Sequence, residues 1–405
     1  MKVLLAHNNY RVQGGAEVFY HEVGRVLSEQ GHEVACFSAM DEKASTTWST
    51  YFPPVTRYNQ GSLATKAIGF PSMVYSRAAK AAMERLIQDF KPDIIHAFAI
   101  YIQLTPSILD AARQAGVPVV MSCNDYKHIC PSYKLFHHGH LCEDCNGGQF
   151  YHAALNRCSH NSMAYSVASA VEAYVHQALN IYRKNVHTFL FASEFMAHKT
   201  EQFWGSETFR WKMLRNPFDA AQYCAESSLG GYALYFGRLI DEKGVNVLLD
   251  AAALTPEIPV MIVGDGPELP ALQAQAERLK LDNVKFLGAK WGAELNTVLQ
   301  GCRFVVVPSL WHENFPYVIL QAFAMGKPVV GSNRGGIPEL VEHGQRGLIY
   351  EATNPEALAA AMLELMQDET KTWKMGEEAK RYANAEFNDA HFYERLMQIY
   401  NEVLV

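Results

Sequence analysis

The stretch "RFVVVPSLWHENFPYVILQAFAMGKPVVGS", residues 303–332, contains the pattern that decides the fold. A short apolar run (303–309) leads through a polar loop into a segment with helical spacing (317–325), and a second apolar run follows (328–332). Continuous Val-rich strands separated by helices indicate a parallel sheet that is covered on both faces. Glu313 lies just before the helix, where free backbone N–H groups and the helix dipole favour an anion. Its carboxylate can cap the helix, or it can lie beside a larger anion that the same N–H groups hold.

The same alternation runs through both halves of the chain. Buried strands are expected at 2–7, 33–39, 93–98, 117–123, 188–193, 232–239, 259–266, 283–288, 303–309 and 328–332. Helices are expected at 14–31, 75–90, 104–115, 163–184, 244–254, 268–280, 292–301, 317–325, 355–367, 370–386 and 389–404.

The segment "LRNPFD" (214–219) separates two runs of this alternation, which predicts two doubly wound α/β domains in series. We expect an N-terminal domain over 1–215, completed by a C-terminal helix over 389–405, and a second domain over 216–388. In such sheets ligands bind beyond the carboxyl ends of the strands. The expected active site is a cleft between the two domains.

The composition fits a folded protein of this size. The chain has 405 residues, of which 49% are hydrophobic and 19% are charged. A chain of 405 residues is longer than one hydrophobic core usually supports, so two domains are expected. The net charge is −7, with +2 in residues 1–220 and −9 in residues 221–405. An acidic total argues against a nucleic-acid partner.

The sequence predicts a cytoplasmic protein, because it contains no apolar run of about 18 residues and no signal-peptide pattern at its start. The weakly basic N-terminal half leaves open a peripheral contact with the inner membrane surface. The stretch over 62–86 combines aromatic, apolar and basic residues and could lie on such a surface. The alternative for this stretch is an ordinary helix that faces the core.

Several strand ends carry residues suited to phosphate. In "FGRLIDEKGV" (236–245), Arg238 and Lys243 place two cations beside the carboxyl end of a strand, which suits a diphosphate. The alternative is a solvated loop in which the intervening acidic residues pair locally. The glycine turns "VQGGAE" (12–17) and "VGDGPE" (263–268) let backbone approach a ligand closely, although each can also be a plain turn.

In order and spacing, these segments resemble the donor-binding domain of GT-B glycosyltransferases of the retaining family 4. The resemblance rests on "FGRLIDEKGV", "IVGDGP", "VKFLG", "PSLWHENFPYVILQAFAMGKPVVGSNRGGIPELV" and "GLIY", and "GGAE" and "CNDYKHICP" extend it over nearly the whole chain. It implies an α/β GT-B fold, in which two Rossmann-like doubly wound parallel-sheet domains face an interdomain cleft. It also implies retaining sugar transfer, without a metal or other cofactor, from a UDP- or GDP-sugar to a glycan or lipid-linked acceptor. Surface polysaccharide biosynthesis is the implied setting.

The resemblance assigns roles to particular residues of this chain. Arg238 and Lys243 match the pair that clamps the diphosphate, together with N–H groups around Tyr317 and Val318. Glu313 matches the carboxylate that contacts hydroxyls of the transferred sugar. The remaining implied donor-binding positions are Gly14, Gly15, Gly237, Gly264, Gly266, Leu287, Asn314, Phe315 and Gln321.

Two positions depart from the family pattern. Gln321 replaces the family's second glutamate, which usually holds the ribose, and Asn124–Asp125 stands where the family often has His-Asp. An amide cannot act as a base, so we expect Asn124 to orient the sugar and Asp125 to approach the acceptor hydroxyl. These departures leave open a catalytically degenerate sugar-nucleotide-binding or scaffold protein of the same fold.

A cysteine-rich insert over 130–158 follows this pair. Cys130, Cys142, Cys145 and Cys158 have the spacing C-x₁₁-C-x₂-C-x₁₂-C, which fits a structural zinc site. The alternatives are four independent thiols, or a disulfide that forms only on oxidation. Because the insert follows Asp125, we expect it to cover the acceptor side of the cleft.

Overall fold

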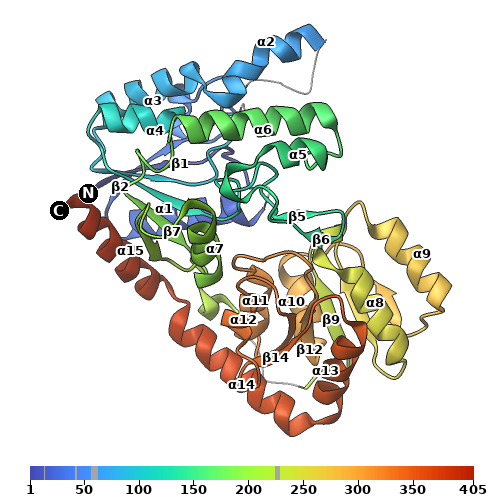
Figure 1. Ribbon diagram of the computed structural model, residues 1–405. Coiled ribbons are helices and arrows are strands. Elements are labelled where there is room, and N and C mark those ends of the chain that lie inside the picture. Colours follow the sequence, from blue (N-terminus) through green and yellow to red (C-terminus); the bar gives the residue numbers. More distant parts are fainter. Residues whose placement is uncertain (13, 42, 56–62, 224–228) are drawn as a thin grey trace. The chain divides into compact units, whose positions relative to one another are not determined.

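The computed structural model of the protein describes residues 1–12, 14–41, 43–55, 63–223 and 229–405. The chain forms two compact units, coloured along the sequence in Figure 1. Unit 1 comprises Met1–Leu135, Glu143–Pro217 and Phe392–Val405, and unit 2 comprises Phe136–Cys142 and Phe218–His391. The main break therefore lies two residues after the expected boundary at 215, and most of the C-terminal helix groups with unit 1. Seven residues of the cysteine-rich insert group with unit 2.

Unit 1 contains a six-stranded parallel sheet with the order β2-β1-β3-β4-β7-β8. Its strands are β1 (Lys2–Ala6), β2 (Glu33–Phe37), β3 (Ile94–Ala97), β4 (Val119–Cys123), β7 (Thr188–Phe191) and β8 (Trp211–Met213). Its helices are α1 (Gly15–Glu29), α2 (Leu63–Val74), α3 (Arg77–Phe90), α4 (Ser107–Gln114), α5 (Tyr151–Leu155), α6 (Met163–Ala178), α7 (Glu194–Trp204) and most of α15 (Asp389–Leu404).

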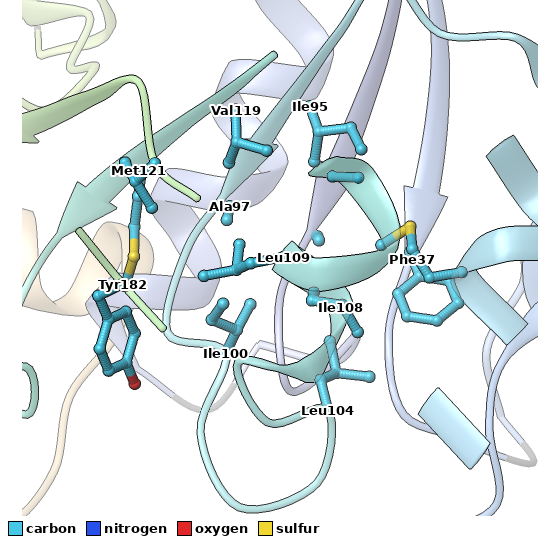
Figure 2. Close-up of a cluster of buried hydrophobic side chains, with 14 of the residues drawn as sticks. Phe37, Ile95, Ala97, Ile100, Leu104, Ile108, Leu109, Val119, Met121 and Tyr182 are labelled. Atoms are coloured by element: carbon cyan, nitrogen blue, oxygen red, sulfur yellow. The ribbon is translucent and has the colours of Figure 1, made fainter. Parts of the chain in front are cut away.

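Both faces of this sheet are buried, which explains why its strands read as unbroken apolar runs. Successive residues of β1 point to opposite faces, so Leu4 packs in one apolar cluster and Val3 and Leu5 pack in another. Figure 2 shows part of the first cluster, in which side chains of β3 and β4 pack against α4. The second cluster includes Tyr400 of α15, which places the C-terminal helix on the opposite face beside α1.

Unit 2 contains a second six-stranded parallel sheet, with the order β11-β10-β9-β12-β13-β14. Its strands are β9 (Ala233–Phe236), β10 (Val260–Val263), β11 (Val284–Phe286), β12 (Phe304–Val307), β13 (Val329–Ser332) and β14 (Gly347–Tyr350). Its helices are α8 (Val245–Leu254), α9 (Leu269–Leu279), α10 (Gly292–Gly301), α11 (Tyr317–Ala324), α12 (Ile337–Val341), α13 (Pro355–Gln367) and α14 (Glu369–Glu386). The small β5–β6 hairpin (Phe136–His137 and His140–Leu141) also belongs to this unit, and the Phe136 side chain is buried in its apolar core.

The stretch over 62–86 contains helix α2 and the first ten residues of α3. The apolar side of α3 is buried in the core of unit 1 through Ala79, Met83 and Leu86, so this part is a core-facing helix. Ser62 lies outside the described residues. Of the helices in the described ranges, none combines the length and the apolar character needed to cross a bilayer.

Candidate active site

The topology of unit 2 marks one edge of its sheet as a binding position. The strand order corresponds to 3-2-1-4-5-6 along the chain, so the direction of winding reverses between the paired strands β9 and β12. In open α/β sheets, ligands bind beyond the carboxyl ends of the strands at such a switch point. The loop after β9 carries Arg238 and Lys243, and the loop after β12 carries Ser309 and Glu313.

The carboxylate of Glu313 is the centre of a compact polar cluster. Its Oε1 atom accepts a hydrogen bond from Lys243 Nζ at 2.6 Å and another from Ser309 Oγ at 2.6 Å. Glu313 is 5% exposed, and the Lys243 side chain is 21% exposed. The ammonium group of Lys243 also lies 5.5 Å from the centre of the Trp311 ring. The fold thus joins two of the predicted site residues, seventy positions apart in sequence, in one ion pair.

This pairing keeps Glu313 ionised despite its burial. Burial on its own raises the pKa of the Glu313 carboxyl. The charge of Lys243 and the hydrogen bonds from Lys243 and Ser309 outweigh burial, so the pKa lies below its usual value. At neutral pH the site therefore holds a carboxylate that can accept hydrogen bonds from hydroxyl groups.

Two glycines permit the close loop packing that holds this ion pair. Gly335 has φ +59°, and a Cβ atom there would lie 2.0 Å from the backbone oxygen of Glu313. Gly244 has φ +67°, and a Cβ atom there would lie 2.0 Å from the backbone oxygen of Pro308. Only a residue without a side chain fits at either position, so these glycines fix the backbone next to Glu313 and Lys243.

Arg238 lies on the same loop and is exposed. Among the described residues, its guanidinium has no ion-pair partner. The hydroxyl of buried Tyr235 donates to the backbone oxygen of Arg238 at 2.8 Å. Burial and the charge of Glu313 raise the pKa of Tyr235, and the charge of Arg238 opposes this rise. The backbone of Arg238 is thus bound to buried Tyr235, on the loop that also carries Lys243.

Helix α11 begins directly after this cluster. Its N-cap residue is Pro316, and no side chain caps its N-terminus. Glu313 is therefore not a helix cap, because its carboxylate binds Lys243 and Ser309 instead. Tyr317 and Val318, the first two helical residues, are half-buried, and their N–H groups belong to the helix terminus that favours an anion. Asn314 and Phe315 are buried in the approach to the helix.

The other predicted donor-binding residues of unit 2 surround the same strand ends. A Cβ atom on Gly264 would lie 1.9 Å from the backbone oxygen of Gly237, and one on Gly266 would lie 2.2 Å from that of Leu239. The close approach that these glycines allow is therefore between two protein loops. The Leu287 N–H donates to Ile262, at the end of the neighbouring strand, at 2.8 Å. The contact of Gly264, Gly266 and Leu287 with a nucleoside stays a prediction.

Gln321 lies on α11 and is also engaged within unit 2. Its side-chain amide donates to the hydroxyl of Tyr223 at 3.1 Å. The Tyr223 ring in turn stacks on Phe218, with ring centres 5.2 Å apart. A ribose that bound Gln321 would compete with the Tyr223 hydroxyl for this amide group.

The glycine turn of unit 1 has a different local structure. Helix α1 begins at Gly15, and the N–H of Gly14 donates to the carboxylate of Glu17 at 2.9 Å. The Asn9 side chain donates to the other oxygen of this carboxylate at 3.1 Å. The carboxylate of Glu17 therefore binds one N–H group at this helix terminus. The expected contact of Gly15 with a phosphate stays a prediction. Gln13 of the same motif lies outside the described residues.

Asn124 and Asp125 follow β4 in unit 1. Asp125 Oδ1 accepts hydrogen bonds from the Tyr101 hydroxyl at 2.8 Å and from the Lys127 N–H at 2.9 Å. Burial nevertheless raises the pKa of Asp125, which makes its carboxylate a better base than a solvated one. The side-chain nitrogen of Asn124 is buried and has no hydrogen-bond partner among the described residues.

Matches to known protein families cover most of the chain. The family described as "Glycosyltransferase Family 4" matches residues 13–222, and the family described as "Glycosyl transferases group 1" matches residues 230–382. The chain belongs to glycosyltransferase family 4. The two matches correspond closely to the two structural units of this family 4 chain.

Individual relatives agree with this membership. The chain is 33% identical over 181 residues to D-inositol 3-phosphate glycosyltransferase of Corynebacterium urealyticum, which is 42% of each chain. It is 29% identical over 175 residues to O-antigen chain mannosyltransferase C of Escherichia coli, which is 43% of this chain and 47% of that one. The chain thus spans less than half the length of these curated relatives.

A solved structure supports the fold over the full length. The crystal structure of HepE from Anabaena in complex with UDP and glucose superposes with a TM-score of 0.68 at 20% identity, covering 99% of this chain and all of that one. Together with the two parallel-sheet units, this similarity confirms the expected GT-B fold of the family 4 chain.

The cysteine-rich insert of this family 4 chain carries the four cysteines of the predicted zinc site, and Cys158 packs against the small apolar cluster that contains Cys145. Cys130, Cys145 and Cys158 belong to unit 1, whereas Cys142 belongs to unit 2. In the described ranges, no three His, Cys, Asp or Glu side chains are grouped to hold a metal ion. The structural zinc site stays a prediction, which metal analysis can test.

Sequence reasoning missed three groups that complete the cluster around Glu313: Ser309, Tyr235 and the backbone of Gly335. Ser309 could have been found, because it directly follows the strand in "RFVVVPS". The sequence contains no signal for the hydrogen bond of Tyr235, because its partner is a backbone oxygen. The role of Gly335 depends on a contact with residue 313 that only the fold creates.

Proposed function

We propose that this chain is a retaining, metal-independent glycosyltransferase that moves a sugar from a nucleotide-sugar donor to a glycan or lipid-linked acceptor. The observation that carries this proposal is the cluster at the switch point of unit 2. Lys243, Glu313 and the N-terminus of α11, which no side chain caps, meet there, and Arg238 lies on the same loop as Lys243.

These groups can bind different parts of the donor. Arg238, Lys243 and the N–H groups at Tyr317 and Val318 bind the pyrophosphate, and Glu313 binds hydroxyls of the transferred sugar. The positive groups stabilise the leaving diphosphate as the bond to the sugar breaks. One oxygen of this diphosphate takes the proton of the acceptor hydroxyl, and the acceptor oxygen bonds to the anomeric carbon on the face that the diphosphate leaves, so the anomeric configuration is retained. Three sources of positive charge leave no electrostatic need for a metal ion.

The similarity to HepE, whose crystal structure contains UDP and glucose, supports a uridine diphosphate sugar as the donor. A GDP-sugar is the alternative donor.

The presence of O-antigen chain mannosyltransferase C among the relatives supports surface polysaccharide biosynthesis as the setting. The intact cluster around Glu313 argues against a catalytically degenerate protein. Gln321 and Asn124, which differ from the family pattern, are the features that favour one.

The exposed face of α6 supports peripheral contact of this chain with a lipid surface. Met163, Val167, Val171 and Tyr174 are all exposed and follow one another at helical spacing along this face. The sole charged residue of α6, Glu172, is buried. A row of exposed apolar side chains of this kind suits contact with a membrane. We expect co-sedimentation with vesicles that contain anionic lipid, and loss of this binding in Val167→Glu. Equal sedimentation of this variant and the wild type would remove α6 from the contact.

The transfer itself is tested with a panel of sugar nucleotides and mass spectrometry. We expect slow release of free nucleoside diphosphate from one or a few donors, at an undiminished rate in excess chelator. Arg238→Ala and Lys243→Ala should each reduce the rate about 10²-fold or more, the range for losing one such stabilising group. Binding of a sugar nucleotide without release would favour the degenerate protein, and near wild-type rates in both variants would remove the mechanism.

A further inference from the structure

A cavity in unit 1 lies outside the donor site. It has a volume of ≈ 200 Å³ and lies among the loop after β4, the cysteine-rich insert, helix α6 and the end of α7. Typical small-molecule pockets enclose about 300–1,000 Å³. The volume of this cavity therefore suits a single ring rather than a complete nucleotide.

Buried charged and polar groups line this cavity. Lys127 Nζ donates to Glu172 Oε2 at 2.7 Å, and the side chains of both residues are 9% exposed. The second carboxylate oxygen of Glu172 has no hydrogen-bond partner among the described residues. The same holds for Nδ1 of His128, a residue that is 6% exposed. Buried polar atoms without partners are destabilising, and native structures retain few of them.

Tyr182 adds a hydroxyl group to this lining. Its ring packs against the apolar core of unit 1, and Figure 2 shows its hydroxyl pointing away from the neighbouring Met121. This hydroxyl has no hydrogen-bond partner in the parts of the chain that the structure describes. Tyr182 therefore offers a donor and an acceptor to a ligand without giving up a contact of its own.

The two histidines of the lining are neutral at physiological pH. Burial lowers the pKa of His128 to about 3, and burial also lowers the pKa of His176 below its usual value. A neutral imidazole has one N–H donor and one acceptor nitrogen. Phe150 and Trp204 add aromatic rings to the same lining. A ligand with several hydroxyl groups and one apolar ring face matches this combination, and a pyranose has both.

The position of the cavity connects it with the acceptor side of the reaction. Lys127, whose side chain pairs with Glu172 in the lining, donates its backbone N–H to Asp125. Asp125 is the carboxylate that we expect near the acceptor hydroxyl. We propose that this cavity binds one sugar ring of the acceptor glycan, through Glu172 and Tyr182, and so selects the acceptor. This inference rests on the proposed transferase function and names the acceptor's class as a saccharide.

The test measures saccharide binding directly, so it does not depend on turnover. Methyl glycosides of glucose, galactose, mannose and N-acetylglucosamine are titrated against the full-length protein by ligand-observed NMR. We expect at least one to bind. Its Kd should rise about 2- to 10-fold in Tyr182→Phe, the range for losing one hydrogen bond, and about 10-fold or more in Glu172→Gln.

Tyr350→Phe is the matched control, because Tyr350 is a buried tyrosine of unit 2 that does not line the cavity. This variant should bind the glycoside like the wild type. UDP binding, measured in parallel, should be unchanged in all three variants.

Failure of all four glycosides to bind would overturn the inference, and so would equal binding by Tyr182→Phe and the wild type. If glycosides bind as expected but no sugar nucleotide is turned over, the proposed function fails while the saccharide site stands. If Glu172→Gln does not fold, Tyr182→Phe alone decides the outcome, because it removes no contact from the folded protein.

Discussion

Removing the amino group of Lys243 tests the electrostatics of the donor site without any ligand. In Lys243→Ala, the carboxylate of Glu313, which is 5% exposed in the wild type, keeps the hydrogen bond from Ser309 but loses its counter-charge. Removing one partner of a fully buried ion pair costs about 3–5 kcal/mol. Because the Lys243 side chain is 21% exposed, water offsets part of this loss, and we expect a decrease of about 2–3 kcal/mol in the free energy of unfolding at pH 7.5.

The loss should depend on pH with a defined sign. In the wild type, the pKa of Glu313 lies below its ordinary value of 4.5, so its stabilising contribution is present above pH 4.5 and is lost as the pH falls through the lowered pKa. In Lys243→Ala, burial becomes the dominant influence and raises the pKa of Glu313 above 4.5. Glu313 then takes up a proton on mild acidification, which relieves the penalty. The difference in stability between the two proteins should therefore be largest near neutral pH and should shrink as the pH falls towards 5.

Urea unfolding of both proteins between pH 5 and pH 8 measures this difference. Lys371→Ala is the matched control, because it breaks an exposed ion pair with Glu364 in the same unit and should cost about 0–1 kcal/mol at any of these pH values. The double variant Lys243→Ala/Glu313→Gln lacks both charges of this pair and should be more stable than Lys243→Ala at pH 7.5. The reasoning is refuted if Lys243→Ala loses no more stability than Lys371→Ala, or if its loss is the same at pH 5 as at pH 8.

Three further predictions concern other parts of the molecule. Arg238→Ala should raise the Kd for UDP about 10-fold or more, because a charge-assisted hydrogen bond is lost. Its free energy of unfolding should change by less than about 0.5 kcal/mol, since Arg238 has no ion pair among the described residues; a large loss of stability would show a structural role instead. Gly335→Ala should cost about 3 kcal/mol or more, because its Cβ atom would lie 2.0 Å from the backbone of Glu313. Gly344→Ala, also at positive φ but with nothing within 4 Å, should cost only about 1–2 kcal/mol, and equal losses in urea unfolding would exclude the clash as the cause. Metal analysis of protein purified without chelator tests the predicted zinc site: about one equivalent of zinc is expected, and less than about 0.2 equivalents would count against the site.

The sequence predicted the inner strands of both sheets because each is an unbroken apolar run. Strand ends were less accurate, as for the expected strand 232–239, which ends at Phe236 in the structure. Its last residues leave the sheet and form the loop that carries Arg238. The edge strands Trp211–Met213 and Gly347–Tyr350 were not predicted: Lys212 interrupts the first, and a glycine begins the second.

The charged residues of the donor site could be predicted individually, but their pairing could not. The ion pair between Lys243 and Glu313 depends on loops from two different strands, and two glycines permit their close approach. Sequence patterns report local structure, whereas these contacts are created by the tertiary fold. The hydrogen bond of Gln321 to Tyr223 and the cavity beside Tyr182 were missed for the same reason.

A crystal structure of the protein with UDP would test the central claim most directly. We predict that the pyrophosphate lies within about 3 Å of the Arg238 guanidinium, the Lys243 ammonium and the N–H of Val318, the distance of a charge-assisted hydrogen bond. Lys243 would then bridge the pyrophosphate and Glu313. A pyrophosphate bound away from the N-terminus of α11, with Arg238 and Lys243 both remote from it, would contradict the assignment of the donor site.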